Sequence, residues 1–224
     1  MARRRVAVLI SGGGSNLQAL LDATTGEGSP ADIALVVSNV ADAFGLQRAQ
    51  RSGVPAICLD HRGFADRAAF DTALDRVLHD AGVELVCLAG FMRILTAGFV
   101  ERWRDRLVNI HPSLLPAFPG LHTHARALSS GVRIHGCTVH LVRAALDDGP
   151  ILVQGLVPVL DGDDASTLAV RVLEVEHRCY PLALALLASG AVTVDGETVT
   201  GDAGRLVLHP SLAGLSAAVG GALP

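Results

Sequence analysis

Short, continuously apolar runs recur along the first ninety residues of the chain, each followed by a glycine or a polar residue. A strand buried on both faces reads as such a run, whereas a half-exposed strand alternates apolar and polar residues. We therefore expect four buried strands of a parallel sheet. The runs are Val6–Ile10, Ile33–Ser38, Pro55–Leu59 and Leu85–Ala89.

Segments with helical periodicity separate these runs. In one of them, Phe70, Leu74 and Leu78 recur at the spacing of a single helix face. One predicted helix begins at about Asn16, and two others cover Ala43–Ser52 and Arg67–Ala81. Because strands and helices alternate, we predict an α/β fold with an open, mostly parallel, doubly wound sheet that is Rossmann-like in its N-terminal half.

The pattern changes from Val108 onward. A proline-rich loop continues to about Leu121, and an Asp-Gly turn signal separates two longer apolar runs. The elements predicted here are strands over Cys137–Val142 and Ile151–Val157, a helix over Thr167–Leu187 and a short β-hairpin over Ala191–Leu208. We expect one domain over residues 1–209 and an Ala/Gly-rich tail over residues 210–224.

Composition excludes several classes of function. Half of the residues are hydrophobic (50%), which excludes a disordered chain, and the net charge of −4 argues against a nucleic-acid partner. All 18 basic residues are arginine. Without lysine the chain cannot form a Schiff base with pyridoxal phosphate, and it cannot form a Walker-type phosphate loop.

The cysteines and the longest uncharged stretch indicate the compartment. The four cysteines form no Cys-x-x-Cys pair and three lie in apolar runs, so we expect reduced thiols in a cytoplasmic protein. The uncharged stretch Leu107–Ala125 contains Pro112, Pro116 and Pro119, so it is not a membrane span.

Three successive glycines lie in Ser11–Asn16, between the first strand and the first helix. Backbone N–H groups of such a turn can bind an anion at the helix N-terminus. The dinucleotide-binding fingerprint does not fit, because Leu17 takes its third glycine position and the second strand ends without an acidic residue. Two interpretations remain: a phosphate site for another ligand, or a tight turn capped by Ser or Asn.

Asn109 and His111 lie two residues apart at the end of an apolar strand, so their side chains point to the same side. Asp147 lies in a later turn. An amide, an imidazole and a carboxylate suit acyl-type transfer, since they can stabilise an oxyanion and move protons. No Ser or Cys sits in a nucleophile elbow, so the attack would come from the substrate. The pair His122 and His124 lacks nearby carboxylate partners, and we expect no metal.

Several motifs together resemble the folate-dependent phosphoribosylglycinamide formyltransferase family. They occur in order between about Val6 and Gly190, and five in sequence are far more specific than one. The motifs are Ile10–Gln18, Gly90–Leu95, Asn109–Pro116 with Phe118–His124, Gly136–His140 with Asp147–Ile151, and Glu176–Pro181.

The resemblance implies transfer of the formyl group of 10-formyltetrahydrofolate to the amine of glycinamide ribonucleotide, in de novo purine synthesis. The folate is a co-substrate that is not tightly bound, and no metal is required. The implied partners are small molecules, with no nucleic acid and no membrane, and the protein would be a monomer or homodimer. The Leu115–Pro116 peptide bond would be cis.

Site roles carry over from the family residue by residue. Asn109, His111 and Asp147 would be catalytic. Thr138 and His140 would order the groups around them. The ribonucleotide would bind Gly14, Ser15, Asn16 and Glu176. The folate would bind Arg67, Met92, Arg93, Ile94, Leu95, Asn109, Arg143, Ala144, Ala145, Leu146 and Asp147.

Three alternatives share this resemblance. A methionyl-tRNA formyltransferase should have an additional C-terminal RNA-binding domain and a basic surface, and a formyltetrahydrofolate hydrolase should have a regulatory domain ahead of the first strand. We expect neither extra domain here. A non-catalytic folate- or nucleotide-binding protein has no need of the set formed by Asn109, His111 and Asp147.

Overall fold

The computed structural model describes residues 2–201 and 205–212. Its strands are β1 (Arg4–Ile10), β2 (Ala31–Ser38), β3 (Ala56–Cys58), β4 (Leu85–Leu88), β5 (Leu107–His111), β6 (Ile134–Leu141), β7 (Ile151–Pro158), β8 (Val192–Asp195), β9 (Thr198–Gly201) and β10 (Leu206–Leu208). Its α-helices are α1 (Ser15–Thr24), α2 (Phe44–Arg51), α3 (Arg67–Asp80), α4 (Ala97–Arg102), α5 (Thr123–Ser129) and α6 (Ala165–Ser189). Two 3-10 helices, η1 (His61–Gly63) and η2 (Pro210–Leu212), complete the described elements.

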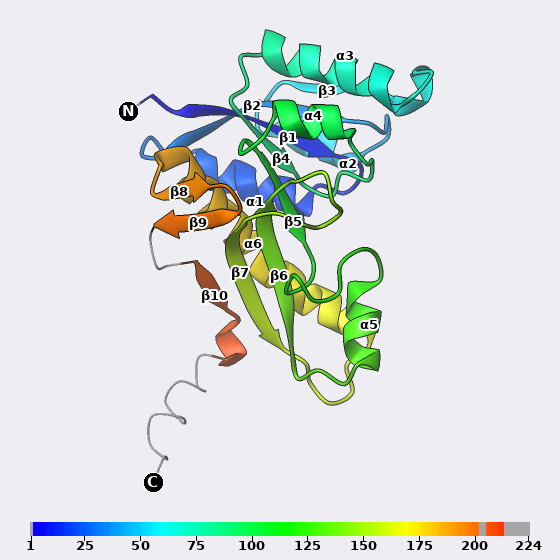
Figure 1. The fold of residues 1–224 in the computed structure, drawn as a ribbon, viewed down its shortest axis with the longest axis vertical. Coiled ribbons are helices and arrows are strands. Elements are labelled where there is room, and N and C mark those ends of the chain that lie inside the picture. Colours follow the sequence, from blue (N-terminus) through cyan, green and yellow to red (C-terminus); the bar gives the residue numbers. More distant parts are fainter. Residues whose placement is uncertain (1, 202–204, 213–224) are drawn as a thin grey trace.

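Eight of the strands form one open sheet in the order β10-β7-β6-β5-β4-β1-β2-β3 (Figure 1). Strand β6 is antiparallel to both β5 and β7, and the other neighbouring strands are parallel. Strands β8 and β9 pair separately as a hairpin. The predicted open, mostly parallel α/β sheet is therefore confirmed.

Helices cover both faces of this sheet, as the continuously apolar strands require. In β1, Val6, Val8 and Ile10 belong to the core beneath α1, α2 and α6. Ala7 and Leu9 point the other way and pack with residues of α3 and α4 (Figure 1). From Val6 to Ile10 each side chain is thus buried on one face or the other, which is why this part of β1 shows no alternation of polar and apolar residues.

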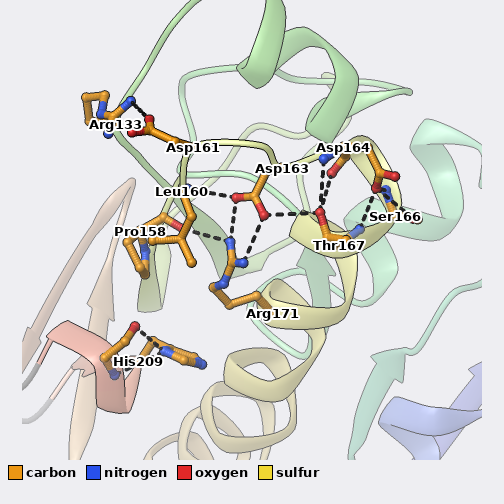
Figure 2. Close-up of polar contacts among 11 residues, drawn as sticks. Arg133, Pro158, Leu160, Asp161, Asp163, Asp164, Ser166, Thr167, Arg171 and His209 are labelled. Atoms are coloured by element: carbon orange, nitrogen blue, oxygen red, sulfur yellow. Dashed lines mark hydrogen bonds and ion pairs between the residues drawn. The ribbon is translucent and has the colours of Figure 1, made fainter.

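Helix α6 is fixed at its start and lies close against the sheet. Asp164 accepts hydrogen bonds from the backbone N–H groups of Ser166 and Thr167, and Asp163 pairs with Arg171 at 2.7 Å (Figure 2). Further along, a Cβ on Gly155 of β7 would lie only 2.6 Å from the Sγ of Cys179 in α6. The absence of a side chain on that glycine allows helix and strand to approach.

One sequence prediction about the C-terminal part is wrong. We expected a single hairpin over Ala191–Leu208, but the hairpin ends at Gly201 and β10 joins the main sheet as a parallel neighbour of β7. Parallel pairing with a strand about fifty residues earlier leaves no local signal in the sequence. Helices α4 and α5 were not predicted, because six or seven residues are too few to establish a helical period. Most of the expected tail, from residue 213 onward, lies outside the described residues.

The connection between β5 and β6 folds back over the sheet edge. It contains the cis Leu115–Pro116 bond that the resemblance implied. The ring of His135, at the start of β6, meets the rings of Phe118 and His124 edge to face, at centroid distances of 5.9 and 5.4 Å. In the described part of the chain, neither ring nitrogen of His135 has a hydrogen-bond partner. Burial lowers the pKa of His135 to about 4.

This buried histidine predicts acid sensitivity of the fold. Because the unfolded chain binds a proton near pH 6.5 and the folded chain binds it only near pH 4, stability is lost as the pH falls between these values. We expect the free energy of unfolding, measured by urea titration, to fall by about 1 kcal/mol through this group from pH 7.5 to 5.5. His135→Phe keeps the ring packing and should remove that part of the loss. An identical pH dependence in both proteins would contradict the prediction.

Candidate active site

The predicted site residues gather where strands β1, β4 and β5 end. The chain leaves β1 through α1 toward β2, whereas β4 lies on the opposite side of β1. Open α/β sheets generally bind their ligands at such a reversal of strand order, outside the carboxyl ends of the strands. The glycine turn follows β1, residues 90–95 follow β4, and Asn109 and His111 end β5 (Figure 1).

His111 lies between two acceptor oxygens. Its Nδ1 is 3.4 Å from Oδ1 of Asp147, and its Nε2 is 3.1 Å from the carbonyl oxygen of Phe118. Both side chains of the ion pair are nearly buried, with 8% and 10% exposure. An imidazole can donate from both nitrogens only when it is protonated, and this geometry offers an acceptor oxygen to each nitrogen.

The Asp147 side chain is held in place by an unusual backbone conformation. The residue has φ of 50°, in the left-handed region that Asp and Asn tolerate better than most residues. Its Oδ2 accepts a 2.6 Å hydrogen bond from the backbone N–H of Gly120. The adjacent Asp148 is exposed, and its carboxylate accepts a bond only from Gly149 among the described residues. The two neighbouring carboxylates therefore have different environments.

His140 orients the amide of Asn109. The two residues are paired across β5 and β6, and the Asn109 Nδ2 lies 3.3 Å from the His140 Nε2. Burial lowers the pKa of His140, which keeps the ring neutral, and its Nδ1 faces the Leu141 carbonyl oxygen at 3.1 Å. The Nε2 is then free to accept one N–H of the Asn109 amide. The second N–H of that amide is left for another acceptor.

Thr138 supports the same region from the next position on that face of β6. Its hydroxyl donates to the Ser113 carbonyl oxygen at 2.7 Å and accepts from the backbone N–H of Leu115 at 2.9 Å. Gln154 adds a third contact at 3.1 Å. Thr138 therefore holds the β5–β6 connection and does not touch Asn109 or His111 through these bonds.

The glycine turn is not capped by a side chain. The N-cap of α1 is Gly14, at φ of 71° and with no side-chain hydrogen bond, so the alternative of a Ser or Asn cap is wrong. A Cβ on Gly14 would lie 2.8 Å from the Cα of Gly45 in α2. A Cβ on Gly12 or Gly13 would meet no atom within 4 Å. The turn thus leaves the start of α1 open on the side of Gly12 and Gly13.

Asn16 and Glu176 meet although they are 160 residues apart. The Asn16 Nδ2 donates to the Glu176 Oε2 at 2.7 Å, which joins α1 to α6 beside the glycine turn. Glu176 is 7% exposed, and burial raises the pKa of its carboxyl to about 7. The Oδ1 of Asn16 is buried and has no partner among the described residues. This pair has polar capacity left for a ligand.

Most of the residues predicted to bind folate lie in two segments, 92–95 and 143–147, each of which exposes a large apolar side chain. Met92 and Ile94 are 75% and 61% exposed, and Leu146 is 67% exposed. The Arg93 guanidinium lies over the ring of Phe70, 4.6 Å from its centroid. Large apolar side chains at this exposure are typical of a ligand-binding surface.

The other two predicted folate-site arginines, Arg67 and Arg143, have different surroundings. Arg67 is exposed at the first position of α3. The guanidinium of Arg143 bonds the carboxylates of Asp105 and Glu197, both through 2.8–2.9 Å ion pairs. Arg143 therefore anchors residues 143–147 to the β8–β9 hairpin. Sequence reasoning missed Asp105 and Glu197, because a carboxylate far along the chain gives no signal of its partner.

Two further features of the described ranges concern metals and membranes. Over residues 2–201 and 205–212, no group of three or more His, Cys, Asp and Glu side chains is arranged to hold a metal ion. In the same ranges, no helix has both the length and the apolar character needed to cross a bilayer.

Comparisons with known proteins give a consistent result. The Formyl transferase family model matches residues 4–184. Phosphoribosylglycinamide formyltransferase of Escherichia coli is 44% identical over 90% of this chain and 95% of its own length. The crystal structure of glycinamide ribonucleotide transformylase 1 from Symbiobacterium toebii has 48% identity and a TM-score of 0.86, over 89% of this chain and 94% of its own.

A trifunctional purine biosynthetic protein, adenosine-3 of Drosophila melanogaster, is 52% identical over 87% of this chain. The chain spans only 15% of the length of that relative. The bacterial relatives, by contrast, match over nearly their whole lengths. The chain belongs to the formyl transferase family and, within it, to the phosphoribosylglycinamide formyltransferases.

Proposed function

We propose that this protein transfers the formyl group of 10-formyltetrahydrofolate to the amine of glycinamide ribonucleotide in de novo purine biosynthesis. The observation that carries the proposal is the nearly buried pair of His111 and Asp147 at 3.4 Å, with Asn109 two residues before His111 in β5. This set can stabilise charge on a tetrahedral carbon and move a proton. Family membership supplies the substrates.

The proposed reaction is direct attack without a covalent enzyme intermediate. The neutral amine of the ribonucleotide bonds to the formyl carbon, and the carbonyl oxygen becomes an oxyanion. Asn109 donates its free N–H to that oxygen, and the charged ring of His111 stabilises it, with Asp147 favouring the charge. The bond from the formyl carbon to the folate nitrogen then breaks. The proton lost by the amine passes to that nitrogen, directly or through His111.

The substrates are assigned to opposite sides of this set. We assign the ribonucleotide phosphate to Gly14, Ser15 and Asn16, and its ribose hydroxyls to Glu176. Since the chain contains no lysine, phosphate binding rests on backbone N–H groups, hydroxyls or arginine.

The folate is assigned to the segments at residues 92–95 and 143–147, together with Arg67 at the start of α3 and Asn109 in β5. The ion pairs of Arg143 support a role in holding its segment in place. We further propose that the protein works in the cytoplasm as a monomer or homodimer and requires no metal.

One assay separates this proposal from its rivals. Formyl transfer from 10-formyltetrahydrofolate is measured with glycinamide ribonucleotide, with aminoacylated tRNA and with water as acceptors. We expect turnover only when glycinamide ribonucleotide is the acceptor. Preferred transfer to tRNA or to water would favour a methionyl-tRNA formyltransferase or a formyltetrahydrofolate hydrolase. Binding of folate without turnover on any acceptor would favour a non-catalytic binding protein.

The roles of Asn109 and His111 predict losses in turnover. Asn109→Ala should lower kcat by about 100- to 1000-fold, because it removes a donor to the oxyanion. His111→Ala should lower kcat at least as far, while the affinities for the two substrates change much less. Steady-state kinetics and separate binding titrations measure the two effects. Near-normal turnover of His111→Ala would exclude its assigned role.

Asp147 and Asp148 form a matched pair of neighbouring carboxylates. Asp147→Asn keeps a residue that tolerates the left-handed backbone but removes the charge beside His111, so kcat should fall by about 100-fold or more. Asp148→Asn should leave kcat close to the unsubstituted value, since that carboxylate faces solvent and its own turn. Equal and mild effects of the two changes in the kinetic assay would reduce Asp147 to a turn residue.

The raised pKa of Glu176 predicts pH-dependent ribonucleotide binding. Ribose hydroxyls donate to the ionised carboxylate, so below pH about 7 binding must also remove a proton. We expect the dissociation constant measured by calorimetry to be about tenfold weaker at pH 6 than at pH 8 through this group. In Glu176→Gln this contribution disappears, whereas any titration of the ligand itself remains. Equal pH slopes in the two proteins would contradict the assignment.

A further inference from the structure

Ser11 connects two segments that follow different strands. Its Oγ accepts the backbone N–H of Met92 at 2.7 Å and donates to the Oδ1 of Asn39 at 2.5 Å. Its own N–H donates to the carbonyl oxygen of Gly90 at 3.1 Å. Asn39 is 2% exposed and follows β2. The single hydroxyl of Ser11 therefore links the ends of β1, β2 and β4.

The glycine turn that begins after Ser11 is fixed on its other side by α2. The Gly12 carbonyl oxygen accepts the N–H of Gly45 at 3.0 Å, and the Gly13 carbonyl oxygen accepts the Nε–H of Arg48 at 2.9 Å. Neither bond touches the segment after β4. Helix α2 thus fixes the turn but not residues 90–95. Of the bonds described here, only those of Ser11 connect the two segments.

Residues 90–96 are held at both ends. At the far end, the backbone N–H of Thr96 donates to the Oδ2 of Asp71 at 2.7 Å, and Asp71 is 1% exposed. In between, Arg93 lies over Phe70. At the near end, the two bonds to Ser11 hold Gly90 and Met92. Removing the serine hydroxyl would release the Met92 amide while leaving the far end in place.

We propose that Ser11 is a positioning residue that sets the ribonucleotide-binding turn and the formyl-donor segment in register for attack. The inference rests on the proposed function, which assigns these two segments to different substrates. Backbone hydrogen bonds between the ends of β1 and β4 run as far as the N–H of Ser11 and the carbonyl oxygen of Gly90, so the position of Met92 depends on the Ser11 hydroxyl. Transfer requires the amine and the formyl carbon about 3–3.5 Å apart, and a displacement of about 1 Å can cost about 100-fold in rate.

The first test separates catalysis from binding. Ser11→Ala should lower kcat by about 10- to 100-fold, while each substrate measured alone binds with nearly unchanged affinity. Ser11→Thr, which keeps the hydroxyl, should retain most of the activity. Ser29→Ala is the control. Its hydroxyl also accepts one backbone N–H and donates to one oxygen, but it precedes β2 and so lies at the amino-terminal ends of the parallel strands, opposite the candidate site.

The second test measures register without turnover. The probe is a bisubstrate in which one carbon joins the ribonucleotide amine to the folate nitrogen, as in the tetrahedral intermediate. Ser11→Ala should weaken its binding by more than the combined effects on the two separate halves, because a rigid link requires fixed spacing. Ser29→Ala should bind all three ligands as the unsubstituted protein does.

The outcomes distinguish the inference from the function on which it rests. If the unsubstituted protein transfers no formyl group to the ribonucleotide, the proposed function fails. If it does so and Ser11→Ala matches it in kcat and in bisubstrate affinity, Ser11 has no positioning role. Loss of affinity for only one substrate, or a loss in Ser11→Thr as large as in Ser11→Ala, would likewise overturn the inference.

Discussion

The contact between His111 and Asp147 imposes requirements on much of the surrounding chain. A nearly buried ion pair is tolerated only when the remaining polar atoms of both groups are also satisfied. The Phe118 carbonyl oxygen and the Gly120 N–H meet that need, so the connection between β5 and β6 has to fold back over the site. Thr138 and the ring of His135 hold that connection against β6. Because β6 runs antiparallel to β5, Thr138 and His135 lie near the end of β5 that carries His111.

The two proposed substrates draw on different layers of the fold. The ribonucleotide side is built from the glycine turn, α1 and α6, on the face of the sheet that holds the larger apolar core. The folate side is built from loops, and its exposed Met92 and Ile94 have little packing of their own. These loops depend on individual polar bonds, such as those of Asp71 and Arg143, for their positions. On this proposal, one subsite is built mainly on helices and the other on loops.

Sequence reasoning identified the features that have a local pattern. The apolar runs of β1, β2 and β4 predict a buried parallel sheet, and the spacing of Asn109 and His111 predicts a shared side of β5. Partners that the fold brings from a distance have no such pattern. Neither the pairing of β10 with β7 nor the bonds from Arg143 to Glu197 could be read from neighbouring residues. The Asp147 charge was predicted as catalytic by resemblance, but its left-handed backbone depends on the whole turn.

The contact between Asn16 and Glu176 has a consequence for how the chain matures. It joins α1 to α6, so this part of the proposed ribonucleotide site does not form until synthesis has passed residue 176 and α6 has docked. A partly made or partly folded chain would therefore lack this subsite. A ligand that binds only the complete arrangement stabilises it against every incomplete one, by a free energy that rises with the logarithm of the ligand concentration once this exceeds the dissociation constant. An abundant ribonucleotide would thus protect finished molecules from unfolding, with no benefit to chains still being made.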